Sequence, residues 1–194
     1  MTVLRPLLFI IYINDLPEIT NIAEFIFFAD DANIIITGAD MAEIVNKLQG
    51  VLPMIESWVD SNGLKMNLKK TKYMLFANRN TKVDDINIHI SNTKIERTVE
   101  ERFLGIILDS KLNWNAHRQK LASKLSRNVG ILRKLKGIVP LNVIKLLYSS
   151  FIQSHLYYCP TVWGLGPKSS LDKIFSAQKK AIRLTSKKFI NHFY

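Results

Sequence analysis

IAEFIFFADDANIIIT, residues 22–37, consists of two short apolar runs with Asp30 and Asp31 between them. The runs 22–28 and 32–37 are rich in Phe and Ile and are too short to be independent helices, so the stretch predicts a β-hairpin. Helical and strand-like patterns occur on both sides of it, which gives an α/β (α+β) fold class.

Helical signals flank the hairpin. Pro6 suits the first turn of a short N-terminal helix. Asp40 and Glu43 resemble a capping box, and the apolar residues after them recur at helical spacing. This pattern predicts a helix that ends at Gly63, with a kink or break at Pro53. Further strands are predicted over 72–76, 86–90, 94–98 and 103–108, and further helices over 114–136, 142–158 and 170–185.

The charge of the chain is concentrated in its second half. The 194 residues have a formal net charge of +11. Residues 1–108 carry 11 basic and 14 acidic side chains, whereas residues 109–194 carry 16 basic and 2 acidic ones. This asymmetry favours an acidic centre beside a surface for phosphates, although a solvated basic face would have the same composition.

The apolar runs and the cysteine content indicate where in the cell the protein resides. The longest apolar run near the start, residues 7–13, is too short to span a membrane. A single cysteine, Cys159, suits a reducing compartment. We therefore expect an intracellular protein, nuclear or cytoplasmic, that is not secreted and has no membrane partner.

The aspartate pair is the first candidate for chemistry. Adjacent carboxylates repel each other, and a divalent cation resolves that conflict. Magnesium takes carboxylate oxygens and keeps water or substrate phosphates as further ligands, so Asp30 and Asp31 form a reasonable half-site for phosphoryl chemistry. The competing interpretation is a solvated turn, because Asp is common in turns.

Several further segments share an order and spacing with one family. They are VLRPLLFIIYINDLP (3–17), FADD (28–31), residues 58–76 with Asn67, Lys70 and Thr71, FLG (103–105), LNW (112–114), His117, YYCPTVWG (157–164) and QKKAIR (178–183). Together they closely resemble reverse transcriptases of non-LTR retrotransposons, the jockey-like group. The resemblance implies a partial right-hand polymerase palm over residues 1–109 and an all-helical, basic thumb and connecting region over 110–194.

The resemblance also implies roles for individual residues. Asp30 and Asp31 match the palm pair that holds two Mg²⁺ ions, with Asp30 as the principal ligand. Lys70 matches a lysine near the leaving phosphates, a candidate proton donor or charge clamp, although lysines are commonly exposed to solvent. The segment Phe103, Leu104 and Gly105 matches the motif that grips the primer end, and an ordinary core strand is the alternative. The implied partners are an RNA template, a DNA primer or target, and deoxynucleoside triphosphates.

The predicted helix over 114–136 supports nucleic-acid binding independently of the resemblance. Its periodicity places an apolar face beside a basic one. Lysines beside a packed apolar face are the arrangement expected for contact with a phosphate backbone, and a solvated amphipathic helix would look the same. The basic face consists of Lys120, Lys124, Arg127 and Lys134. We interpret His117 and His155 as structural, and Trp58, Trp114 and Trp163 as packing residues.

The departures from the family limit the expected activity. Met1 and Thr2 stand where the family has a Gln-Gly-Ser segment, and Arg5 replaces a small residue before Pro6. The fingers and the strand with the first catalytic aspartate would lie upstream, so the remainder of the polymerase is an expected partner. We therefore expect this chain alone to be inactive as a polymerase. Two alternatives stay open: a nonenzymatic nucleic-acid-binding remnant that uses the basic helices, and an unrelated magnesium phosphohydrolase.

Overall fold

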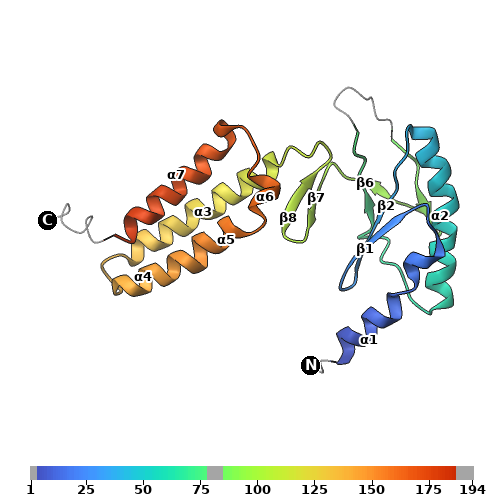
Figure 1. Cartoon of the computed structure of the whole chain (residues 1–194), viewed down its shortest axis with the longest axis horizontal. Coiled ribbons are helices and arrows are strands. Elements are labelled where there is room, and N and C mark those ends of the chain that lie inside the picture. The colour runs from blue at the N-terminus through green and yellow to red at the C-terminus, as the bar shows by residue number, and fades with distance from the viewer. Residues whose placement is uncertain (1–3, 78–84, 187–194) are drawn as a thin grey trace. The chain divides into compact units, whose positions relative to one another are not determined.

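The computed structural model describes residues 4–77 and 85–186, so Val3 of the family-like opening lies outside the described residues. Helices and strands both contribute, which agrees with a mixed α/β class. Internal contacts divide the chain into two compact units, Met1–Thr98 and Val99–Tyr194, which we call unit 1 and unit 2. Figure 1 shows the elements of each. None of the helices in the described ranges is long and apolar enough to cross a membrane.

Unit 1 is built around one long helix. Its elements are α1 (Leu4–Ile13), a 3-10 turn (Leu16–Ile19), β1 (Glu24–Phe28), β2 (Asp31–Ile35), α2 (Met41–Ser61), β3 (Lys72–Tyr73), β4 (His89–Ile90), β5 (Thr93–Lys94) and β6 (Glu96–Arg97). β1 and β2 pair in antiparallel fashion, which confirms the predicted hairpin. The strand predicted over 72–76 is only two residues long, and it pairs in parallel with β6.

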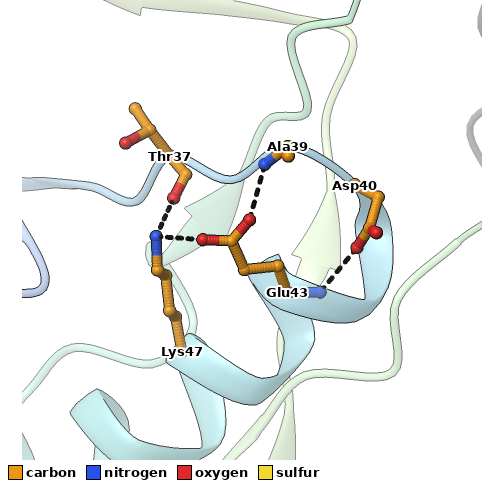
Figure 2. Close-up of polar contacts among 5 residues, drawn as sticks. All are labelled: Thr37, Ala39, Asp40, Glu43 and Lys47. Carbon is orange, nitrogen blue, oxygen red and sulfur yellow. Dashed lines mark hydrogen bonds and ion pairs between the residues drawn. The ribbon is translucent and has the colours of Figure 1, made fainter.

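The predicted capping box fixes the start of α2. The Asp40 side chain accepts a hydrogen bond from the Glu43 backbone N–H at 2.8 Å, and Glu43 accepts one from the Ala39 N–H at 2.7 Å (Figure 2). Lys47 donates to the Thr37 carbonyl and pairs with Glu43, both at 2.7 Å. The bond from Lys47 lowers the pKa of Glu43. These contacts tie the end of the β1–β2 segment to the first turns of the helix.

Two faces of α2 carry two small cores. Val51, Ile55 and Val59 pack with Ala23 and Phe25 of the hairpin segment. The other face packs against buried isoleucines of the β4–β5 region, including Ile88, Ile90 and Ile95. Of the kink or break predicted at Pro53, the break does not occur, because the helix continues through this residue to Ser61. Pro53 is exposed, and burial of α2 on both sides compensates for the missing backbone donor.

Unit 2 is a small helical bundle with a hairpin at its start. Its elements are β7 (Glu100–Phe103), β8 (Ile106–Asp109), α3 (Asn115–Leu135), α4 (Leu141–Tyr148), a π-helical turn (Ser149–Gln153), α5 (Ser154–Tyr157), α6 (Pro160–Trp163) and α7 (Lys168–Leu184). Leu125, Leu132, Ile152 and Ile174 are almost completely buried in its core. α3 packs against both α7 and the α4–α5 segment (Figure 1).

The segment at the start of unit 2 is a hairpin and not a single strand. A single strand was predicted over 103–108, but Leu104 and Gly105 form a turn with φ angles of 45° and 86°. Positive φ at both central residues is the geometry of a tight hairpin turn. Ile106 of β8 belongs to the same core as α3, and the division between the two compact units falls before β7.

Candidate functional site

The tip of the β1–β2 hairpin carries the aspartate pair. Phe28 and Asp31 are the last paired residues, with Ala29 and Asp30 as the turn between them. Ala29 adopts a φ of 53°, which is unusual for a residue with a side chain. Asp30 and Asp31 are both exposed, so their carboxylates are open to a ligand. The turn thus presents two adjacent carboxylates beyond an apolar strand pair.

The donor set at this tip fits part of a magnesium site. Carboxylate oxygens are the ligands that Mg²⁺ prefers, and two of them with water or phosphate oxygens can complete its coordination. Within residues 4–77 and 85–186, no cluster of three or more His, Cys, Asp or Glu side chains is suited to hold a metal. Within these ranges Asp30 and Asp31 could therefore supply only part of a metal's ligands, and the phosphohydrolase alternative gains no further acidic residue beside Asp30 there.

Lys70 lies in a turn elsewhere in unit 1. The Asn67 carbonyl accepts hydrogen bonds from the backbone N–H groups of Lys70 at 2.9 Å and Thr71 at 3.0 Å, and from the Thr71 hydroxyl at 3.1 Å. The turn is well fixed and the Lys70 side chain is exposed. Across the described ranges, no ion pair joins Lys70 to Asp30 or Asp31. Its predicted role would be exerted on a bound substrate.

The segment Phe103 to Gly105 is a braced turn. The Tyr158 hydroxyl donates a hydrogen bond to the Leu104 carbonyl. The Tyr158 ring lies against Gly105, where an added Cβ would be 3.4 Å from the ring. Tyr158 accepts a 2.8 Å bond on its own carbonyl from the Trp163 indole. The YYCPTVWG segment thus holds the turn that the resemblance assigns to the primer end.

Two buried charged residues, Arg118 and Asp109, extend this brace, and no local sequence pattern indicates their roles. Arg118 is 3% exposed and donates to the Trp163 carbonyl at 2.9 Å, the Asn113 carbonyl at 2.5 Å and the Asn115 side chain at 2.7 Å. A Cβ at Gly166 would collide with the guanidinium. Arg118 therefore connects the first turn of α3 to the end of α6.

Asp109 anchors the start of α3. Its carboxylate is 8% exposed and accepts backbone N–H bonds from Lys111 at 3.1 Å, Asn113 at 3.0 Å and Trp114 at 2.7 Å. Trp114 precedes the helix with a φ of 59° and has no side-chain cap of its own. Asp109 thus serves as a remote cap and joins β8 to α3.

The predicted apolar and basic faces of α3 are present. Leu121, Leu125, Val129 and Leu132 are buried. On the solvent side, all four predicted nucleic-acid-binding residues are exposed: Lys120, Lys124, Arg127 and Lys134. We call these four the outer row. Their exposure permits contact with a polyanion and does not by itself establish one.

The histidines and tryptophans have structural surroundings. His117 Nδ1 accepts the Ile107 N–H at 3.3 Å, and burial, followed by the charges of Lys120 and Arg118, lowers the pKa of His117. Burial and Lys124 likewise lower the pKa of His155. Trp58 packs in the core of unit 1, and Trp114 and Trp163 pack in that of unit 2, which confirms the packing interpretation.

Comparison with known proteins identifies relatives. A family model described as reverse transcriptase (RNA-dependent DNA polymerase) matches residues 2–108. The chain is 26% identical over 197 residues to the RNA-directed DNA polymerase from mobile element jockey of Drosophila melanogaster, and 24% identical over 196 residues to that of Drosophila funebris. It is also 24% identical over 192 residues to the probable RNA-directed DNA polymerase from transposon BS of Drosophila melanogaster.

These alignments differ in how much of each protein they cover. They include 94 or 95% of this chain but 21% of each relative. The chain therefore spans about a fifth of the length of the curated relatives it matches. No solved structure gives a significant match.

Proposed function

This chain belongs to the reverse transcriptase (RNA-dependent DNA polymerase) family, and we propose that it supplies the aspartate pair and the primer-holding turn of a polymerase from a non-LTR mobile element. The reaction would be templated nucleotidyl transfer to a DNA primer on an RNA template. The observation that carries the proposal is the family match over residues 2–108 together with Asp30 and Asp31 exposed at a hairpin tip. Such a polymerase would act on chromosomal DNA in the nucleus.

The aspartates would bind the metal in this reaction. By the family resemblance, Asp30 would be the principal ligand and Asp31 the lesser one; Asp30 lies in the turn itself, and Asp31 begins β2. Two magnesium ions, when bound, would stabilise charge on the attacking and leaving oxygens of an in-line displacement. The exposed carboxylates are free to approach the triphosphate, which would complete the coordination.

Lys70 and the Leu104–Gly105 turn would act on the two ends of the substrate. A lysine near the leaving phosphates can donate a proton or neutralise charge. The turn would hold the primer terminus, and the bond from Tyr158 to Leu104 supports this role by limiting movement of the turn. We further propose that residues 1–109 correspond to the palm and 110–194 to the thumb and connection, with the outer row as part of the nucleic-acid surface.

A nonenzymatic nucleic-acid-binding function is the second candidate. The excess of basic residues after residue 108 and the exposed outer row favour it. The two candidates differ in metal dependence. A binding remnant would show steep salt dependence and no requirement for magnesium, whereas nucleotidyl transfer requires the metal.

Primer extension tests the proposal. The purified chain, given an RNA template, a DNA primer, deoxynucleoside triphosphates and Mg²⁺, is expected to bind the hybrid without extending the primer, since its described residues supply only a half-site. Joined to the preceding region of a jockey polymerase, it is expected to extend the primer. In that chimera Asp30→Asn should abolish extension, while Asp60→Asn, at an exposed position on α2, should not. Equal activity of the two variants would refute the assignment of Asp30.

A further inference from the structure

Two open cavities follow one another between α3 and α7 of unit 2. Their volumes are about 660 and 770 Å³. Both are lined by Gln119, Ala122, Ser123 and Lys173, so they form one continuous hollow, which we call the α3–α7 groove. Figure 1 shows the two helices side by side.

Small side chains keep this groove open. The helices meet through buried residues such as Leu125, Ile174 and Ala181. Above that contact, Ser126 and Gly130 of α3 face Ser176 of α7 across the groove. A Cβ added at Gly130 would have no heavy atom within 4 Å, so the space beside it is unfilled.

The groove is lined by donors and positive charge. Arg133 projects from α3, and Lys173 and Lys180 project from α7. Hydroxyl and amide side chains also line the groove: Gln119, Ser123, Ser126, Ser169, Ser170 and Ser176. The Ser170 hydroxyl donates to the Pro167 carbonyl at 2.8 Å. Arginine, lysine, serine and glutamine side chains are the groups that contact phosphate oxygens in nucleic-acid complexes. Asp172 in the first cavity and Glu100 in the second contribute carboxylates to the lining, which oppose anion binding.

We propose that the α3–α7 groove holds the phosphodiester backbone of nucleic acid. The inference rests on the proposed function, in which this unit contacts a template–primer hybrid, and it names where the backbone lies. Lys120 of the outer row also lines the second cavity, whereas Lys124, Arg127 and Lys134 lie on a face of α3 that is separate from the groove. At about 100° per residue, the centres of these two faces are roughly 95° apart around the helix. The outer row belongs to one helix, whereas the groove is lined by donors of two helices.

Two charge-matched variants separate the faces. The groove variant combines Arg133→Gln, Lys173→Gln and Lys180→Gln, and the row variant combines Lys124→Gln, Arg127→Gln and Lys134→Gln. Both remove three positive charges from exposed positions. Binding of a labelled RNA–DNA hybrid to the full chain is measured by fluorescence anisotropy between about 50 and 200 mM salt, the range over which phosphate contacts change affinity most visibly. Circular dichroism confirms that each variant is folded.

The groove variant is expected to lose more affinity for the RNA–DNA hybrid than the row variant. Each lost phosphate contact reduces the slope of log affinity against log salt by about 0.7 to 0.9, so three lost contacts reduce it by about 2 to 3. Affinity at about 100 mM salt should fall by at least about tenfold, and the row variant should lose less. If the row variant loses as much as the groove variant, or more, the proposal is overturned. If the unmodified chain does not bind the RNA–DNA hybrid, both this proposal and the proposed nucleic-acid function are overturned.

Two single substitutions test charge and shape separately. Asp172→Asn removes one of the two opposing carboxylates and should strengthen binding about two- to threefold, a gain that partial unfolding cannot produce. Ser126→Phe fills the groove without changing charge and should weaken binding. Unchanged affinity in both variants would show that nucleic acid does not enter the groove.

Discussion

Replacing Asp109 by asparagine keeps the shape of the side chain and removes its charge, so it tests how firmly β8 holds the start of α3. In the native protein the two carboxylate oxygens accept three backbone N–H bonds, the shortest from Trp114 at 2.7 Å. An asparagine can orient its carbonyl oxygen toward Lys111 and Asn113 or toward Trp114. In either orientation an amide NH₂ group meets at least one N–H donor.

The magnitude follows from these contacts. A hydrogen bond to a charged acceptor contributes about 1.5–3 kcal/mol, and a negative charge near a helix N-terminus contributes about 0.3–1 kcal/mol. We therefore expect Asp109→Asn to lower the free energy of unfolding of unit 2 by about 3 kcal/mol. For a domain of this size each kcal/mol shifts Tm by about 4–8 °C, which gives a decrease of about 12–24 °C.

Thermal unfolding followed by tryptophan fluorescence measures this shift, because Trp114 and Trp163 both lie in the core of unit 2. Asp172→Asn is the matched control, since it removes the same charge from an exposed position on α7. Its Tm should stay within about 4 °C of that of the unmodified chain, because surface substitutions are usually within about 0.5 kcal/mol. If Asp109→Asn lowers Tm no further than this control, the carboxylate does not anchor the helix.

Three other substitutions or conditions have defined outcomes. Arg118→Lys should lower the free energy of unfolding by about 2–3 kcal/mol in a urea titration, because an ammonium group cannot reproduce the forked donors, and an unchanged midpoint would contradict this. Lowering the pH from about 7.5 to 5.5 should decrease Tm, because the pKa of His117 lies below its usual 6.5 and the unfolded chain takes up the proton first. The stability is complete above 6.5 and is lost as the pH falls toward the folded pKa, so His117→Asn should flatten the dependence. Leu132→Ala should lower the free energy of unfolding by about 2–5 kcal/mol, whereas alanine at the exposed Ile131 should lower it by less than about 1 kcal/mol. Equal decreases in the two variants would place Leu132 outside the core.

Features that depend on neighbouring residues could be predicted from the sequence. The hairpin over residues 22–37 follows from two apolar runs around a turn, and the start of α2 follows from Asp40 and Glu43. The buried face of α3 follows from leucines at helical spacing. In each case the interactions that select the structure lie within a few residues, so the local pattern contains them.

Features that depend on distant partners could not be predicted in the same way. The local pattern predicts one strand over 103–108, because the residues on both sides of Leu104 and Gly105 are apolar and contain no strong turn signal. The structure has a hairpin turn at these two residues instead. The residue that braces it, Tyr158, is 54 positions away. Pro53 was expected to disrupt α2, yet packing on two faces keeps the helix continuous.

The cations of α3 show why composition alone does not locate a binding surface. Arg118, Lys124 and Arg133 contribute equally to the net charge, but the first is buried among carbonyl acceptors, the second is on the outer row and the third lines the groove. Helical periodicity separates these positions by angle. Because α7 packs along one side of α3, the residues on that side line a groove that has donors from both helices. Two variants with the same net charge are therefore expected to bind nucleic acid differently, because the contacts to phosphate depend on the shape of the surface as well as on its charge.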